Sequence, residues 1–244
     1  MITKESRELY LAERFLPELF KGQHYTVSQP APPLSDMIIY VGNKRIGIEM
    51  TALILDESIR RQESDQDSIL REAQILFEKK YQLPLHVSVT FNKTANWDKP
   101  NRNQIAAFIA KTIIDSVSKN PELLQCQSTF GIRIDDIENQ YICTIDIYYS
   151  HSLTIPCWTA ITSFWVPNLP IDKVQNIIDR KNKNVTGYLR GCDEVWLLIL
   201  ETGSPSSYFD NFDDLQKATF QSSFSRTLIG RISKGELLTL QSNY

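Results

Sequence analysis

The sequence predicts an α/β fold in which helices flank a mixed central sheet. Segments with the apolar spacing of helices alternate with segments that have the spacing of strands, which is typical of this class. Two short apolar runs surround Gly42 and Asn43 within residues 36–51 and predict an antiparallel hairpin, because this dipeptide suits a two-residue turn. The continuous apolar run EVWLLIL at 194–200 predicts a central strand that is covered on both faces.

The other elements follow from the same spacing. Helices are expected over residues 4–20, 56–81, 101–118 and 171–183. Pro17 should kink or restart the first helix. Strands are expected in LHVSVTF (85–91), GIRI, YICTIDIYY and AITSFWV, and the aromatic residues of FWV are expected in the core. The chain becomes polar after TGSPSS, so residues 201–244 are expected to form an appendage packed on the same domain.

The composition is that of a globular protein. The chain has 244 residues, of which 42% are hydrophobic and 23% charged, and a core of that size needs no disulfide or metal. The four cysteines, Cys126, Cys143, Cys157 and Cys192, form no C-x-x-C pair, which predicts reduced, mostly buried thiols. The N-terminus lacks an apolar signal core and no apolar run approaches a membrane span, so we expect a cytoplasmic protein with no membrane partner.

The net charge of −3 gives no support to the idea that the whole surface is basic and binds nucleic acid. A local patch is nevertheless present, because five basic residues oppose two acidic ones between residues 172 and 190. The basic residues are Lys173, Arg180, Lys181, Lys183 and Arg190. This segment could meet phosphates, and the alternative is a solvated helix end.

The hairpin geometry brings two acids together. With Gly42 and Asn43 as the turn, Asp36 faces Glu49, and directly opposed side chains lie about 5 Å apart on one face. Alternation places Thr51, Arg45 and Gly47 on the same face, and it places the apolar residues Met37, Ile39, Val41, Ile46, Ile48 and Met50 on the other. A shift of the turn by one residue on each side would instead oppose Asp36 to Thr51.

Opposed carboxylates repel, and protonation, a cation of the protein or a bound metal would relieve the repulsion. Two carboxylates at this spacing suit a hard divalent ion such as Mg²⁺, which prefers oxygen ligands and can polarise a phosphate. The alternative is a solvated face on which Arg45 neutralises the pair formed by Asp36 and Glu49.

These residues resemble a motif of the PD-(D/E)XK nuclease superfamily. Asp36 follows Pro32 and Pro33, and a strand, a turn and a second strand lead to Glu49-Met50-Thr51. The order helix, hairpin, helix, strand over residues 4–91 is similar to the core of that family, and the likeness is looser as far as residue 200. The resemblance implies a restriction-endonuclease-like mixed sheet flanked by helices, with a nuclease-like domain over residues 1–200.

The resemblance also implies roles for single residues. Asp36, Glu49 and the backbone carbonyl of Met50 would hold Mg²⁺ or Mn²⁺, and Glu13 would assist through a water. Thr51 stands where the family has a lysine, whose positive charge offsets charge on the transition state.

Another residue could supply the missing charge. Lys181 ends the apolar helical stripe of Val174, Ile177 and Ile178 and is the candidate for this role. The alternative is a lysine that the helix dipole favours near a C-terminus. Candidate contacts to nucleic-acid phosphates are Arg60, Arg61, Lys181 and Lys183.

The expected function is therefore Mg²⁺-dependent hydrolysis of nucleic-acid phosphodiesters, with DNA the favoured partner. A homodimer is an expected assembly, because enzymes that cut both strands often dimerise. Two alternatives stay open. One is a catalytically inactive nuclease-fold protein that binds nucleic acid or a protein, and the other is an α/β interaction protein whose carboxylates are simply surface residues.

Overall fold

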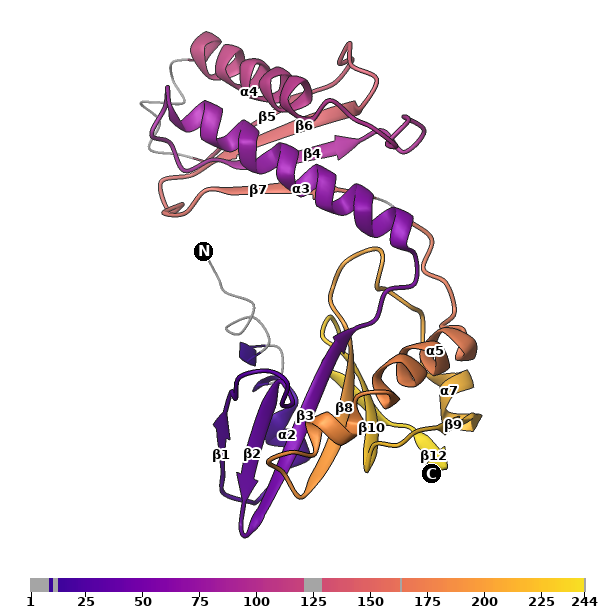
Figure 1. Ribbon diagram of the computed structural model, residues 1–244. Coiled ribbons are helices and arrows are strands. Elements are labelled where there is room, and N and C mark those ends of the chain that lie inside the picture. Colours follow the sequence, from indigo (N-terminus) through magenta and orange to yellow (C-terminus); the bar gives the residue numbers. More distant parts are fainter. Residues whose placement is uncertain (1–8, 11–12, 121–128, 163, 244) are drawn as a thin grey trace. The chain divides into compact units, whose positions relative to one another are not determined.

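The computed structural model describes residues 9, 10, 13–120, 129–162 and 164–243, which belong to two compact units (Figure 1). Residues 1–57 and 165–244 form the first, which we name the hairpin unit. Residues 58–164 form the second, which we name the inserted unit. Helices and a multi-stranded sheet occur in both, so the α/β class with a mixed sheet is confirmed.

The hairpin unit is built on a six-stranded sheet. Its strands lie in the order β1 (Tyr25–Ser28), β2 (Met37–Val41), β3 (Lys44–Ala52), β8 (Glu194–Glu201), β10 (Arg226–Arg231) and β11 (Glu236–Thr239). β8 is parallel to both β3 and β10, whereas the other neighbours are antiparallel. Two short parallel strands, β9 (Thr219–Gln221) and β12 (Gln241–Asn243), pair separately.

Short helices accompany this sheet. They are α2 (Leu16–Leu19), α5 (Ile171–Asn182), α6 (Val185–Tyr188) and α7 (Asp213–Lys217). Pro17 lies in the first turn of α2, so the predicted restart is confirmed, since proline fits the start of a helix. The helix expected over residues 171–183 is confirmed by α5. Most of the start of the first predicted helix lies outside the described residues.

The two faces of the six-stranded sheet bury two different apolar clusters. On one face Ile46, Ile48 and Met50 of β3 lie in a cluster with Phe15 and Leu16 of the α2 region, as the hairpin alternation predicts. The other face is also covered, because α5 and β8 share a second cluster. The members from these two elements are Val174, Ile177, Ile178, Val195, Leu197 and Ile199. The sheet is therefore enclosed on both sides along β8.

β8 is the buried centre of the sheet, as its apolar sequence predicts. It lies between β3 and β10, and every residue from Val195 to Glu201 is buried. Trp196, Leu198 and Leu200 enter the cluster beside α2, and the alternate residues enter the cluster beside α5. A strand with apolar residues on both faces must occupy such a position.

The inserted unit has a four-stranded sheet in the order β5 (Phe130–Ile134), β6 (Ile142–Tyr149), β4 (His86–Phe91) and β7 (Cys157–Ile161). The helices α3 (Glu57–Glu78) and α4 (Arg102–Lys119) cover one face, and their apolar residues share a cluster with Val87, Val89 and Phe91 of β4 (Figure 1). Asn101 caps α4, because its side chain accepts a hydrogen bond from the Gln104 N–H at 3.2 Å.

The division of the chain differs from the expected domain over residues 1–200 with an appendage at 201–244. The resemblance places LHVSVTF after the hairpin and helix of one core, but β4 pairs with β6 and β7 in the inserted unit. Residues 201–244 supply β10 and β11 to the six-stranded sheet of the hairpin unit, where Leu228 and Ile229 are fully buried. The parallel pairing of β10 with β8 is a long-range contact, and the polar composition of the segment conceals it.

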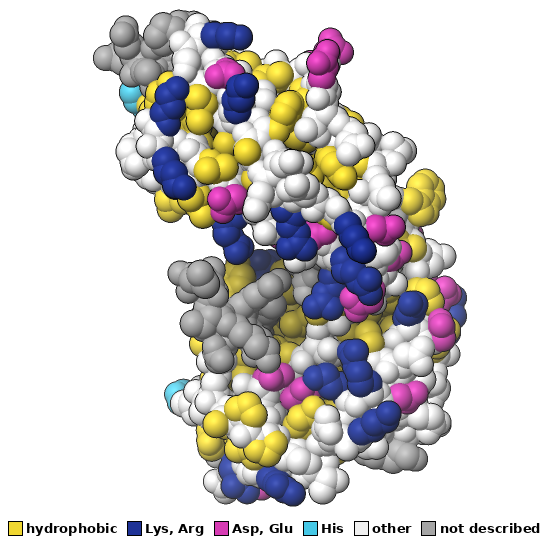
Figure 2. Space-filling view, turned by 45° about the horizontal axis from the view of Figure 1, so that its top comes forward, with side chains coloured by type: hydrophobic (Ala, Val, Ile, Leu, Met, Phe, Trp, Pro, Cys, Tyr) yellow, Lys and Arg dark blue, Asp and Glu magenta, His cyan; other side chains and the backbone are white. Residues whose placement is uncertain are grey.

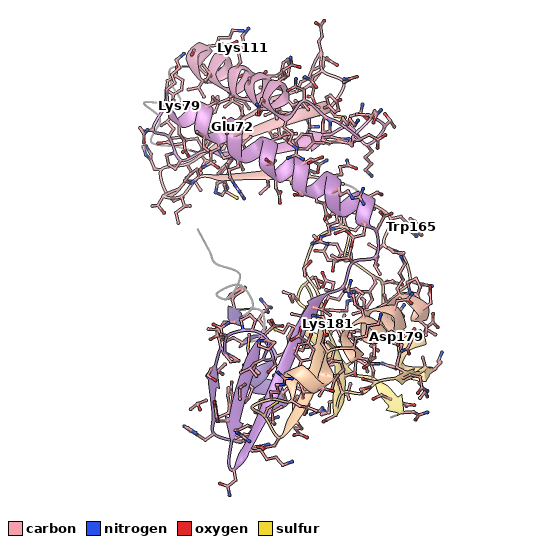
Figure 3. The ribbon with its side chains drawn as sticks, viewed as in Figure 1. Glu72, Lys79, Lys111, Trp165, Asp179 and Lys181 are labelled. Carbon is pink, nitrogen blue, oxygen red and sulfur yellow. The ribbon has the colours of Figure 1, made fainter. Side chains whose placement is uncertain are left out.

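Some side chains that were expected in the core are exposed. Trp165 is 90% exposed, because β7 ends at Ile161 before the FWV segment (Figure 3). Cys143 and Cys157 are free thiols, as predicted, but both are exposed. Cys192 is free and buried, and Cys126 lies outside the described residues.

Gly47 allows the segment before β2 to approach β3 closely. A Cβ at position 47 would lie 2.7 Å from Ser35 Oγ and 2.8 Å from Cys192 Sγ, which is closer than real Cβ contacts allow. Ser35 is itself held, because its hydroxyl donates to the Met37 carbonyl at 3.0 Å. Glycine is therefore required beside Ser35, the residue that precedes Asp36.

Gly47→Ala should lower the free energy of unfolding by about 1–3 kcal/mol, because the added methyl group overpacks this contact. Urea denaturation measures the change. Gly131→Ala is the matched control, since a Cβ there would meet only the Ile147 carbonyl oxygen at 3.9 Å. Equal stability of the Gly47→Ala variant and the wild type would contradict the close approach.

Candidate functional site

The register of the hairpin places Asp36 opposite Glu49. Pairing runs from Val41 opposite Lys44 to Met37 opposite Ile48, as the Gly42-Asn43 turn predicts. Continuing it by one residue opposes Asp36 to Glu49, so the shifted register is wrong. Asp36 is fixed there, because its Oδ2 accepts a hydrogen bond from the Met50 N–H at 2.7 Å.

The two carboxylates differ in their exposure to solvent. Asp36 is half-buried, whereas only 5% of Glu49 is exposed. The expectation of a solvated face is therefore wrong for Glu49. Thr51, two residues further along β3, is half-buried and pairs with Ile199 of β8.

Lys181 reaches Glu49 from the helix that covers this face. Its Nζ donates to Glu49 Oε1 at 2.5 Å, and the exposed fractions of the two side chains are 20% and 6%. In Figure 3 Lys181 lies nearer to β3 than Asp179 does. The buried positions of Val174 and Ile178 on α5 orient the helix so that Lys181 ends the stripe facing the sheet, as the spacing predicts.

Arg45 does not neutralise the carboxylate pair. Its Nη2 lies 2.8 Å from Asp193 Oδ1, and its backbone N–H donates to Asp193 Oδ2 at 2.8 Å. The guanidinium of Arg45 lowers the pKa of Asp193 through these hydrogen bonds. Arg45 thus joins the hairpin to the start of β8, and the cation beside Glu49 comes from Lys181.

The groups around Glu49 shift its pKa in opposite directions. Burial of its carboxylate raises the pKa of Glu49 most, and the nearby charge of Asp36 raises it further. Hydrogen bonds from Lys181 and Tyr188 act in the opposite direction, and the net effect is a raised pKa. The sequence reasoning missed Tyr188, because α5 ends before it and helical spacing from Lys181 cannot be continued into α6.

The backbone of Met50 is turned toward Asp36. The backbone groups of odd-numbered residues in and just after β3 face β8, because the Arg45 carbonyl accepts from the Asp193 N–H at 2.7 Å and the Leu53 N–H donates to the Leu200 carbonyl at 2.7 Å. Alternation directs the N–H and C=O of even-numbered residues to the opposite side. The Met50 carbonyl therefore points to the side of β3 on which its N–H meets Asp36.

This donor set fits a hard cation. Within the described part of the chain, no three His, Cys, Asp or Glu side chains are grouped to hold a metal ion. The available donors are two carboxylates, from Asp36 and Glu49, and the carbonyl of Met50. Mg²⁺ or Mn²⁺ accepts oxygen donors of this kind and keeps waters in its remaining positions.

Several predicted residues are not brought to this site by a described contact. Glu13 is exposed, and Phe15 and Leu16 just after it pack on the opposite face of the sheet. Arg60 and Arg61 belong to α3 in the inserted unit. The remaining candidate, Lys183, is exposed at the C-terminal cap of α5, two residues after Lys181.

Comparison with known proteins finds no protein-family model, curated protein or solved structure that matches this chain. None of the described helices combines the length and the apolar character needed to cross a membrane. On the face shown in Figure 2, Lys and Arg side chains are interspersed with Asp and Glu, so this face is not uniformly basic.

Lys181→Met should lower the free energy of unfolding by about 3 kcal/mol at neutral pH, because Glu49 stays buried and loses its cation. The loss should shrink as the pH falls. Burial raises the pKa of Glu49 above its ordinary value of 4.5. As the pH falls, the buried carboxyl therefore takes up a proton before the pH reaches 4.5, and a neutral carboxyl needs no cation.

Urea denaturation at several pH values measures this dependence. Lys173→Met is the matched control, because Lys173 is an exposed lysine on the same helix. A loss in the Lys181→Met variant that stays constant or grows on acidification would show that the pair with Glu49 is not its cause.

Proposed function

We propose that the protein is a metal-dependent nuclease that hydrolyses phosphodiesters of nucleic acid, with DNA as the favoured substrate. The observation that carries the proposal is the contact of Lys181 with Glu49, beside Asp36. Through this contact Lys181 brings a positive charge from α5 to the site, whereas Thr51 on β3 carries no charge.

The order of elements around the site supports this proposal. β1, β2 and β3 form an antiparallel meander, and α5 is followed by β8, which lies parallel to β3. This order resembles the core of the PD-(D/E)XK superfamily, with the inserted unit placed between β3 and α5. The strand after the helix is then β8 and not the LHVSVTF segment.

Each residue has a definite part in the proposed reaction. Asp36, Glu49 and the Met50 carbonyl would hold Mg²⁺ or Mn²⁺, which would supply positive charge to the phosphate and make a water more acidic. A water oxygen bonds to phosphorus and gives up a proton to solvent, the bond to the leaving oxygen breaks, and the leaving oxygen takes up a proton from solvent. Lys181 keeps its proton and offsets the negative charge that develops on the phosphoryl oxygens.

Thr51 has a smaller part. Its hydroxyl can accept or donate a hydrogen bond to a water on the carboxylate face, but it brings no charge. The expected homodimer and the contacts of Arg60, Arg61 and Lys183 with phosphates belong to the same proposal.

A second candidate function is that of an inactive relative that binds nucleic acid or a protein. The observation that favours it is the same ion pair, because Lys181 already neutralises Glu49 and the site has no need of a metal to relieve repulsion. Such a protein would bind nucleic acid in a salt-sensitive way, or form a stable complex, without cleavage.

Cleavage of single- and double-stranded DNA and of RNA in Mn²⁺ tests the proposal. Glu49→Ala and Asp36→Asn should abolish activity, because each removes a negatively charged carboxylate from the metal site. Lys181→Met should lower the rate at saturating Mn²⁺ by about 10²–10³-fold, the size expected when one group that stabilises transition-state charge is lost.

Lys217→Met serves as the control and should leave the rate unchanged, since that lysine is exposed at the end of α7, outside the basic segment of α5. Cleavage that persists in Glu49→Ala would come from another site or a contaminant and would sink the proposal. Salt-sensitive binding without cleavage in either Mg²⁺ or Mn²⁺ would establish the second candidate.

A further inference from the structure

The short strand β9 has one edge that no strand occupies. On the side of β12, the Ser222 N–H donates to the Asn243 carbonyl at 3.1 Å. Alternation directs the backbone groups of Gln221 and Ser223 to the opposite edge of β9. Within the part of the chain that the structure describes, no third strand pairs there, and α5 lies against this edge (Figure 1). The partners of these backbone groups must therefore come from α5.

Gln175 and Asn182 supply those partners. The side-chain amide of Gln175 pairs with the backbone of Gln221 twice, because its Oε1 accepts from the N–H at 3.0 Å and its Nε2 donates to the carbonyl at 3.0 Å. Asn182 Nδ2 donates to the same carbonyl at 3.3 Å, and its Oδ1 accepts from the Ser223 N–H at 2.9 Å. The two amides therefore take the place of a neighbouring strand along β9.

The segment that receives these bonds is itself fixed to the six-stranded sheet. Phe220 and Phe224 are fully buried in the cluster beside α5. Between them, the hydroxyls of Ser222 and Thr227 share a hydrogen bond at 2.8 Å, and Thr227 belongs to β10. The Ser222 hydroxyl also accepts from the Phe224 N–H at 3.2 Å. The two amides thus join α5 to a segment that cannot move independently of the sheet.

These hydrogen bonds fix the position of α5 along its own axis. The burial of Val174 and Ile178 holds the helix on the sheet, but apolar burial is not directional and resists sliding less than hydrogen bonds do. A slide by one residue moves a helix by about 1.5 Å, which would break bonds that depend on distance and angle. Asn182 directly follows Lys181, so one of the bonded amides lies where the Lys181 side chain leaves the helix.

We propose that Gln175 and Asn182 are positioning residues that hold α5 where the Lys181 ammonium reaches the carboxylate face of β3. This assignment rests on the proposed function, in which Lys181 offsets charge on the phosphoryl oxygens. Both amides act through Lys181, because their bonds are made to β9. A displacement of about 1 Å can cost a catalytic group as much as 100-fold in rate, so the anchoring of α5 determines how much of the effect of Lys181 is realised.

The combined variant Gln175→Met, Asn182→Leu tests the assignment, because it replaces both amides by side chains of similar size that cannot donate to β9. Its kcat at saturating DNA and Mn²⁺ should be about 10-fold lower than that of the wild type, with KM unchanged. Each single variant should show a smaller loss. In a Lys181→Met background the two substitutions should cause no further loss, whereas a general loss of structure would lower kcat in both backgrounds.

Asn120→Leu is the matched control. The Asn120 side chain donates to the Ser116 carbonyl at 2.7 Å in the inserted unit, so the variant loses a bond of the same kind from side chain to backbone. Its kcat should equal that of the wild type.

Urea denaturation of the metal-free protein gives a readout that does not depend on cleavage. Lys181→Met raises the equilibrium constant of unfolding when the helix holds Lys181 at Glu49. In the protein that lacks both amides, this increase should be about 5-fold smaller, because the two effects are coupled through the position of α5.

The outcomes distinguish the two proposals. If the wild type cleaves and the combined variant has the same kcat, or loses the same factor with and without Lys181, the positioning role is overturned and the nuclease proposal stands. If the wild type cleaves nothing in Mg²⁺ or Mn²⁺, the nuclease proposal falls, and the urea measurements alone decide whether the two amides place Lys181. Equal increases of the unfolding constant in both backgrounds overturn that placement in either case.

Discussion

The burial of Glu49 is the constraint on which the rest of the site depends. A carboxylate that is 5% exposed, beside a second carboxylate, is stable only where donors reach it. Lys181 reaches it from α5, and this helix is anchored by apolar residues on the face of the sheet that carries Glu49. The charge of Glu49 on β3 is therefore compensated only when α5 packs correctly on β8, because a shift of the helix would leave Glu49 without its cation.

The chain order explains how the chain can carry an insertion between two of the elements that build the site. β3 ends at Ala52 and α5 begins at Ile171, and the inserted unit occupies the intervening chain with a core of its own. The parallel pairing of β3 with β8 needs a crossover connection, which can be long without changing the register of the strands. The residues that define the site all belong to the hairpin unit, so its geometry does not rest on where the inserted unit lies.

Local signals predicted much of this arrangement. The Gly42-Asn43 turn set the register that opposes Asp36 to Glu49, and the spacing on α5 singled out Lys181. Local signals of this kind do not show which strands pair when they lie far apart in the sequence. The strand LHVSVTF was recognised, but alternation cannot reveal which sheet a strand joins. Likewise Trp165 reads as a core residue until the end of β7 is known, and Tyr188 depends on how the chain turns after α5.

The balance of charge indicates what the site can bind. Asp36 and Glu49 carry two negative charges and Lys181 one positive charge, so the metal-free site has one net negative charge and repels a phosphodiester. A divalent ion reverses that sign and makes the site complementary to a single phosphate charge. In the proposed nuclease, phosphate binding at these residues would therefore require the metal. An inactive relative without the metal would have to contact nucleic acid elsewhere, and the basic residues of the α5 segment are candidates for that contact.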